Sequence, residues 1–174
     1  NYSEDFHSVG AYNITDLTDA KIADINENII PATEISPIQG CELKNNVLLI
    51  FPYVGLNYDK IDFEGFEAIL HGTYHSGTAC TEDSSPYSIL NLITKCQKIP
   101  TDIYISPSKN EGERYDTIRI MGDHEKEGNP ITFLYGTTTE TAYAKLLIAY
   151  SIFTKKEDIQ NFLTTNRNHE FISE

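Results

Sequence analysis

The sequence predicts an α/β domain in which a small parallel sheet lies between two layers of helices. Two observations predict it. Short unbroken apolar runs recur along the chain, and stretches with apolar residues at helical spacing alternate with them. An unbroken apolar run is typical of a strand that is covered on both faces, and alternation with helices favours a parallel sheet. The runs are Val47–Phe51, Ala68–Leu70 and Ile103–Ile105, with weaker ones at Phe133–Tyr135 and Thr117–Met121.

Three helices are expected from apolar stripes and from capping residues. Ile89, Leu92, Ile93 and Cys96 recur at i, i+3, i+4 and i+7, which gives one buried stripe. Serine and threonine hydroxyls commonly accept hydrogen bonds from the first turn of a helix. The expected helix starts are Ser85 before Pro86, Thr137 with Glu140, and Thr154 with Glu157. The resulting architecture is a flavodoxin-like three-layer sandwich.

The chain is expected to divide into an arm, residues 1–45, and a domain, residues 46–174. The first segment is polar and is interrupted by Pro31, Pro37 and Gly40, with a short strand possible at Lys21–Ile25. Such a segment buries little by itself. We expect it to be an extended linker and the end of an amino-terminal domain that is not part of this chain.

Composition excludes several classes of partner. The 174 residues carry a formal net charge of -13, which disfavours binding to nucleic acid or to an anionic membrane surface. The longest apolar run, Val47–Phe51, is far short of the roughly 20 residues that cross a membrane. Cys41, Cys80 and Cys96 have no disulfide or metal-site spacing. Reduced thiols, a cytoplasmic location and no metal or cofactor are therefore expected.

Candidate functional residues lie in loops that follow the predicted strands, because ligands of open α/β sheets bind there. These loops are Pro52–Tyr58, His71–Ser84 and Ser106–Tyr115. The middle loop holds glycines, hydroxyls and two histidines. It is either a turn whose polar groups satisfy one another or a loop that holds a carboxylate or amide.

Three sharper interpretations are disfavoured. His75 and Ser76 are adjacent, which rarely aligns a base with a nucleophile, and no nucleophile-elbow motif is present. His71, His75 and Cys80 could bind zinc, but they stand in a glycine-broken loop. The hydroxyls of Thr137–Thr141 could hold a phosphate, but a helix cap explains the same residues.

Four segments together resemble the carboxy-terminal domain of the L-asparaginase and glutaminase family, which uses threonine nucleophiles. They are Asn46–Tyr53, Phe63–Cys80, Ser106–Tyr115 and Gly136–Tyr150. The resemblance implies a two-domain enzyme that forms dimers or tetramers and hydrolyses a side-chain amide, of asparagine or a similar molecule, to the acid plus ammonia. It places the nucleophile on the amino-terminal domain, so this chain carries no catalytic residue. The carboxy-terminal domain completes a neighbouring subunit's active site.

The resemblance also implies which residues contact substrate. The loop residues Tyr74, His75, Ser76, Gly77 and Thr78 fill the place of the family's glycine-rich substrate loop. Thr78 stands where the family usually has Asn, and it keeps a hydroxyl but loses the amide's two-donor group. An acidic contact is expected near Asp123–Glu127.

Two other functions are compatible with the residues. One is a stand-alone, flavodoxin-like domain that binds a small ligand or regulates. The other is an independent hydrolase that works through His75 and Ser76. If the domain packs on another, it is expected to expose an apolar patch near residues 1–45.

Overall fold

A four-stranded parallel sheet forms the centre of the computed structural model, which describes residues 41–108, 119–122, 131–166 and 170–171. The strands are paired in chain order, β1-β2-β3-β4, and all three pairings are parallel. Their bounds are Val47–Ile50 for β1, Ala68–His71 for β2, Asp102–Ser108 for β3 and Ile131–Tyr135 for β4. The predicted α/β class and parallel sheet are confirmed. The predicted arm and the segment Lys21–Ile25 lie outside the described residues, apart from positions 41–45.

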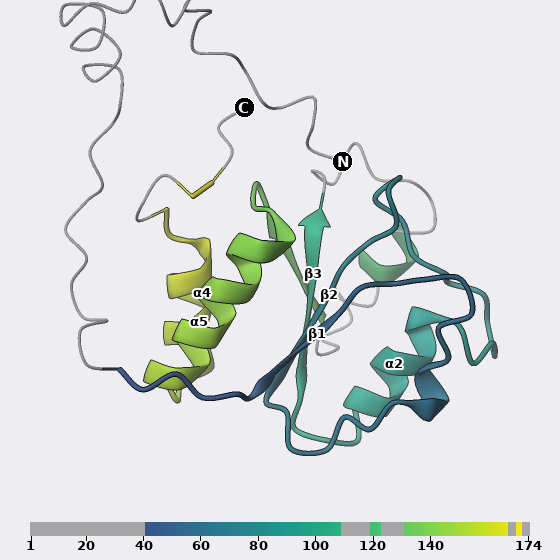
Figure 1. Ribbon diagram of the computed structural model, residues 1–174, viewed down its shortest axis with the longest axis horizontal. Coiled ribbons are helices and arrows are strands. Elements are labelled where there is room, and N and C mark those ends of the chain that lie inside the picture. Colours follow the sequence, from purple (N-terminus) through teal and green to yellow (C-terminus); the bar gives the residue numbers. More distant parts are fainter. Residues whose placement is uncertain (1–40, 109–118, 123–130, 167–169, 172–174) are drawn as a thin grey trace, which may run out of the picture.

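Helices cover both faces of the sheet (Figure 1). One face packs against α4, Thr139–Ile152, and α5, Lys156–Thr164; the other packs against α2, Ile89–Cys96, with the short 3-10 helix η3, Tyr58–Lys60, beside it. The inner strand β2 shows how the faces divide. Ala68 and Leu70 point into the cluster beneath α4, and Ile69 points into the cluster beneath α2.

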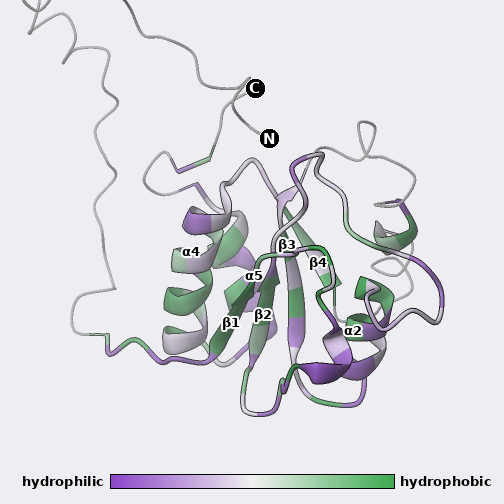
Figure 2. Ribbon diagram, turned by 45° about the vertical axis from the view of Figure 1, so that its right-hand side comes forward, coloured by the Kyte–Doolittle hydropathy of each residue, from purple (hydrophilic) through white to green (hydrophobic). Residues whose placement is uncertain are grey.

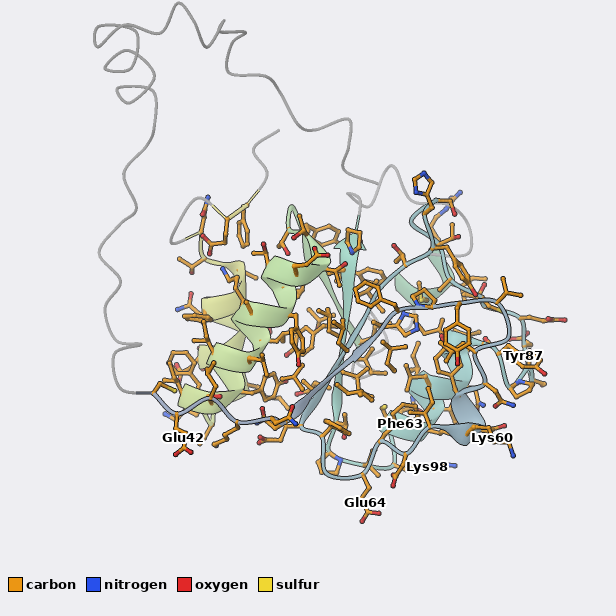
Figure 3. All side chains as sticks on the ribbon, viewed as in Figure 1. Glu42, Lys60, Phe63, Glu64, Tyr87 and Lys98 are labelled. Carbon is orange, nitrogen blue, oxygen red and sulfur yellow. The ribbon has the colours of Figure 1, made fainter. Side chains whose placement is uncertain are left out.

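Burial on both faces explains the unbroken apolar runs. Successive side chains of a strand point to opposite faces, so each residue of β2 enters one core or the other. All four β2 residues are buried. Figure 2 shows β1 and β2 hydrophobic along most of their lengths. Figure 3 shows Phe63, which is 5% exposed, beside α2, whereas Lys60 and Lys98 point outward.

The described parts of the connections between successive strands lie on one face of the sheet. The β1–β2 connection contains η3 and the β2–β3 connection contains α2, both in contact with the same core. After β3, residues 119–122 are helical and Met121 packs into that core as well. After β4 the chain passes to the other face, where α4 packs. The opposite face is therefore covered by the carboxy-terminal helices α4 and α5.

The observed helix starts differ from the predicted ones. The N-cap of α2 is Ser88 rather than Ser85, because the Ser88 amide donates to the Ser85 carbonyl and closes a turn ahead of the helix. The N-cap of α4 is Thr138, whose hydroxyl accepts from the Thr141 amide.

The predicted boxes at Thr137 with Glu140 and Thr154 with Glu157 do not set the helix starts. Thr137 donates its hydroxyl to the Thr138 carbonyl instead, and α5 follows Lys155 with no side-chain cap. The strand expected at Thr117–Met121 is also wrong over its described residues, because residues 119–121 are helical. No helix in the described part of the chain combines the length and apolar character needed to cross a membrane.

A buried lysine joins the two carboxy-terminal helices. Lys145 of α4 is 7% exposed, and its Nζ donates to the Thr165 carbonyl at 2.7 Å and to Glu170 Oε1 at 2.6 Å. The ammonium also lies 4.5 Å from the ring centroid of Phe171. A cation beside the last carbonyls of a helix is favourable. Lys145 therefore holds the end of α5 and the tail beyond it against α4.

Replacing this lysine is expected to destabilise the fold. Lys145→Met keeps the aliphatic stem but leaves the Thr165 carbonyl and Glu170 without their donor, at a cost of about 2 kcal/mol. Urea unfolding monitored by circular dichroism measures the change. Lys98→Met, on an exposed side chain, is the matched control and should shift the unfolding free energy by less than about 0.5 kcal/mol. Equal losses in both variants would contradict the role given to Lys145.

Candidate substrate-binding edge of the sheet

The loop that follows β2 contains a tight turn, which we call the Tyr74–Thr78 turn. The Gly77 amide donates to the Tyr74 carbonyl at 2.7 Å, and the Tyr74 amide donates to the Thr78 carbonyl at 2.7 Å. Gly77 has φ +73°, in the left-handed region that favours glycine. The five residues expected to contact substrate are thus brought together in one turn at the carboxyl edge of the sheet.

The side chains of the turn are presented to solvent and to one another. His75 and Ser76 are exposed, and Tyr74, Gly77 and Thr78 are half-buried. The Ser76 and Thr78 hydroxyls lie 2.8 Å apart and share a hydrogen bond. Two adjacent hydroxyls can both donate to and accept from a polar ligand. The turn therefore satisfies its own polar groups and still offers a small polar surface.

A buried histidine supports this loop from below. His71, at the end of β2, is 0% exposed. Its Nδ1 lies 2.5 Å from the Gly72 carbonyl, which can only accept, so Nδ1 carries the proton. Nε2 then accepts from the Tyr58 hydroxyl at 2.6 Å. The pair ties the loop after β1 to the loop after β2.

Burial fixes the protonation states of this pair. Desolvation lowers the pKa of His71 to about 4, although its hydrogen bond to Gly72 acts in the opposite direction. Desolvation also raises the pKa of Tyr58 well above its ordinary value. At neutral pH His71 is therefore an uncharged imidazole with both nitrogens engaged, and Tyr58 keeps its proton.

These contacts weaken the zinc and nucleophile interpretations of the loop. His71 cannot ligate a metal while both its ring nitrogens are occupied. Within the described ranges, no three His, Cys, Asp or Glu residues are grouped as metal ligands would be. The Ser76 hydroxyl is paired with Thr78, a geometry that does not activate it as a nucleophile.

A second loop lies against the first. Phe51, Tyr53 and Val54 follow β1 and are 54%, 62% and 95% exposed. A Cβ on Gly72 would lie 3.2 Å from Phe51 Cδ1, so the Phe51 ring packs directly over Gly72. Leu43 is the exposed large apolar residue of the described positions 41–45. The described residues therefore expose apolar side chains in the loop after β1 and at Leu43 of the arm, while residues 1–40 lie outside the described part of the chain.

Hydroxyls also join the ends of β3 and β4. The Thr139 hydroxyl donates to the Ser106 carbonyl at 3.0 Å, and the Ser106 hydroxyl donates to the Thr137 carbonyl at 3.3 Å. All three residues are buried. These hydroxyls, which could have suggested a phosphate site, connect β3 to the start of α4.

One polar atom beside the turn has no partner. The Thr73 hydroxyl oxygen is buried and, in the part of the chain that the structure describes, accepts and donates no hydrogen bond. A buried hydroxyl without a partner is unfavourable by about 1–3 kcal/mol.

Sequence reasoning did not single out Thr73, or the pair of Tyr58 and His71. The acidic contact expected at Asp123–Glu127 lies outside the described residues.

Comparisons with known proteins relate the fold to one solved enzyme. No protein-family model and no curated protein matches the sequence. Among solved structures, the chain is similar to the thermostable L-asparaginase from Thermococcus kodakarensis, with a TM-score of 0.57 and 16% identity. The match covers 76% of this chain and 40% of that chain, which is the extent expected of one domain. At this identity the likeness shows a shared fold.

The buried histidine predicts a pH-dependent stability. The unfolded chain binds a proton at this residue below about pH 6.5, while the folded chain does not until about pH 4. Acidification between these values therefore favours unfolding, by up to about 3 kcal/mol from this residue. His71→Gln should be less stable than wild type at pH 7 but lose less stability down to pH 4.5. Urea unfolding at each pH measures it.

A histidine of the same loop provides the control for this experiment. His75 is exposed in the same loop, so His75→Gln shows how the loss of a solvent-accessible histidine changes the pH dependence. Identical pH slopes for wild type and His71→Gln would contradict the assignment of a buried neutral imidazole.

The backbone of the Tyr74–Thr78 turn predicts a ranking of glycine replacements. No atom lies within 4 Å of a Cβ built on Gly77, so only its positive φ opposes a side chain. Gly77→Ala should cost about 1 kcal/mol, and Gly77→Asn less, because Asn tolerates this conformation better. Thermal unfolding ranks the two. A larger loss for Asn than for Ala would show that the turn adopts another conformation.

Proposed function

We propose that this chain is the carboxy-terminal domain of an L-asparaginase-like amidohydrolase, which hydrolyses a side-chain amide to the acid plus ammonia. The observation that carries the proposal is the extent of the structural likeness, which takes in 76% of this chain and 40% of the solved L-asparaginase chain. The four-segment sequence resemblance points to the same domain independently.

The proposed role of this chain is to bind and enclose substrate rather than to break the bond. Amide hydrolysis through a hydroxyl needs an activating base and an oxyanion site. His71 is neutral and fully engaged, and the Ser76 hydroxyl is paired with Thr78. These contacts favour a nucleophile on another domain, with the Tyr74–Thr78 turn forming a wall of the completed pocket.

The partner is proposed to be an amino-terminal domain of the same protein, within a dimer or tetramer. The exposed side chains of Phe51, Tyr53 and Val54 support a protein neighbour at the carboxyl edge, because exposed apolar clusters commonly mark interaction sites. Their loop packs on Gly72, directly before the turn. The same edge could then meet both the neighbouring domain and the substrate.

The stand-alone alternative finds less support. A flavodoxin-like domain binds its ligand between adjacent strands whose outgoing connections diverge, which here are β3 and β4. At that place the Ser106 and Thr139 hydroxyls already donate to backbone carbonyls.

The proposal is tested by ammonia release. This chain alone should release no ammonia from L-asparagine or L-glutamine. The coding sequence ahead of Asn1 should encode a threonine-bearing domain, and protein made from its natural start should be active. In that protein, Ser76→Ala and Thr78→Ala should raise KM by about tenfold with a smaller effect on kcat, as expected for lost binding contacts.

Thr94→Ala, on the exposed side of α2, is the matched control and should leave KM unchanged. Turnover by this chain alone that disappears in Ser76→Ala would overturn the proposal in favour of an independent hydrolase. A reading frame that begins at Asn1 without a companion domain would also contradict it.

A further inference from the structure

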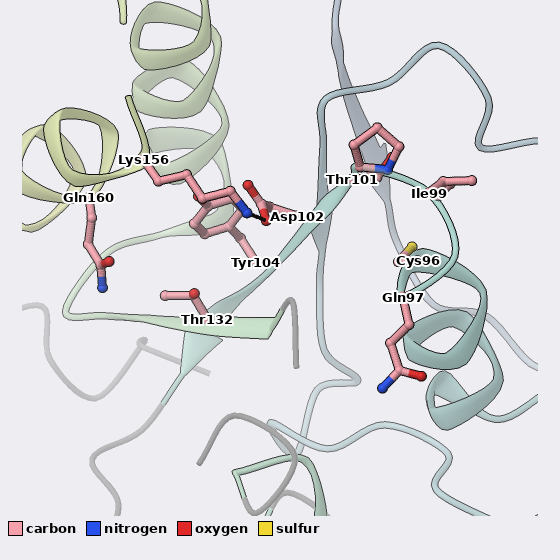
Figure 4. A pocket seen from close by; sticks show the side chains of 10 residues that line it. Cys96, Gln97, Ile99, Thr101, Asp102, Tyr104, Thr132, Lys156 and Gln160 are labelled. Carbon is pink, nitrogen blue, oxygen red and sulfur yellow. Dashed lines mark hydrogen bonds and ion pairs between the residues drawn. The ribbon is translucent and has the colours of Figure 1, made fainter. Parts of the chain in front are cut away.

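A groove lies at the opposite edge of the sheet, at the amino ends of β3 and β4 (Figure 4). Its volume is about 460 Å³, within the range of small-molecule sites. Tyr104 and Thr132 come from the two strands, Lys156 and Gln160 from α5, and Gln97 from the residue after α2. Because the Tyr74–Thr78 turn follows the carboxyl end of β2, this groove is separate from the substrate-binding edge.

A carboxylate is held in the wall of the groove by a chain of hydrogen bonds. Asp102 Oδ2 accepts from the Tyr150 hydroxyl at 2.9 Å, and Tyr150 lies 2.9 Å from the Tyr104 hydroxyl. Since Tyr150 uses its only proton on Asp102, Tyr104 must donate to Tyr150. Desolvation raises the pKa of Tyr104 to about 12 and that of Tyr150 further, so both remain donors at neutral pH. The Asp102 carboxylate is therefore fixed in orientation.

The other carboxylate oxygen pairs with a side chain that is easily displaced. Lys156 Nζ lies 2.7 Å from Asp102 Oδ1, but the lysine side chain is 80% exposed while that of Asp102 is 18% exposed. Ion pairs with such exposed side chains contribute little net free energy. The exposed Lys156 ammonium thus lies beside an Asp102 carboxylate whose orientation is fixed, and an external ammonium group can take its place.

The remaining lining suits the body of such a ligand. Ile99, Pro100 and the Tyr104 ring provide apolar and aromatic surface, and the Gln97 and Gln160 amides provide neutral polar groups. The net charge of -13 raises the local concentration of cations around the protein. We propose that this groove binds a small aliphatic amine whose ammonium group pairs with Asp102 in place of Lys156.

The test compares three probes of equal length with the full chain: 1,5-diaminopentane, pentane-1,5-diol and glutarate. Nuclear magnetic resonance titration at about 0.15 M salt limits long-range electrostatic binding. The side-chain amide signals of Gln97 and Gln160 report on the groove. The diamine should shift both signals and saturate, and neither the diol nor glutarate should do so.

Two variants are expected to act in opposite directions. Asp102→Asn should weaken diamine binding at least tenfold, and Lys156→Met should tighten it at least threefold by removing the competing ammonium. Lys155→Met and Asp158→Asn, on neighbouring exposed side chains, are the matched controls and should change affinity less than twofold. If Asp102→Asn fails to fold, Lys156→Met still tests the proposal, because the Lys156 side chain is exposed and its replacement should leave the fold intact.

Three outcomes would overturn the proposal. Equal effects of Asp102→Asn and Asp158→Asn would show non-specific attraction to an acidic protein. Glutarate binding that Lys156→Met abolishes would make the groove an anion site. Unchanged or weaker diamine binding in Lys156→Met would remove the competition on which the proposal depends.

Discussion

Burial of both faces of a four-stranded parallel sheet is the constraint on which this structure depends. Parallel strands joined by crossovers of one hand place their connections on one face, and η3, α2 and the helical residues 119–122 occupy it here. The opposite face would expose Val47, Leu70 and Leu134 if α4 and α5 did not return to cover it. The carboxy-terminal segment is thus required by the hydrophobic core, and Lys145 is placed where it fastens that segment.

The same constraint shapes the carboxyl edge. Loops leaving a fully buried sheet must satisfy backbone and side-chain polar groups close to the core, and here they do so mainly with one another. His71 is held by Gly72 and Tyr58, Ser106 and Thr139 join β3 to α4, and the Tyr74–Thr78 turn closes on itself. The polar groups named here, within the described residues, are therefore committed to holding the loops in place. Fixed loops of this kind suit the pocket wall that we propose, and His71, with both ring nitrogens engaged, has none available to act as a base.

The sequence predicted the centre of each strand better than its ends. The apolar run Ile103–Ile105 marks the part of β3 that is buried on both faces, but the strand extends from Asp102 to Ser108. Ser106 and Ser108 are buried through contacts that residue type does not reveal. Helix starts were missed for a related reason. Several serines and threonines stand within a few residues of each start, and backbone hydrogen bonds, such as Ser88 to Ser85, decide among them.

The sequence indicated which loop holds the candidate site but not how the residues of that loop are arranged. Glycines and hydroxyls after a buried strand indicated the loop His71–Ser84, and the family resemblance singled out residues 74–78 within it. The structure gathers these five residues in one turn. The support beneath the turn joins Tyr58 to His71 across two different loops, a contact that only the β1–β2 pairing creates. Likewise, Asp102 lies far in the sequence from Tyr150 and Lys156, and it meets them because α4 and α5 return across β3.

Polar groups at the two edges of the sheet differ in how they are held, and this difference bears on the functions that we propose for them. At the carboxyl edge, the Ser76 and Thr78 hydroxyls satisfy each other on an exposed turn, so they can exchange partners when another surface closes over them. At the amino edge, the Asp102 charge is oriented by buried tyrosines and neutralised by one exposed lysine. In the function that we propose, the hydroxyl contacts of the turn strengthen when a second domain excludes water from them, because hydrogen bonds strengthen as the local dielectric falls. The Asp102 carboxylate already lies in a groove of this chain, so the amine that we propose binds there needs no other domain to reach it.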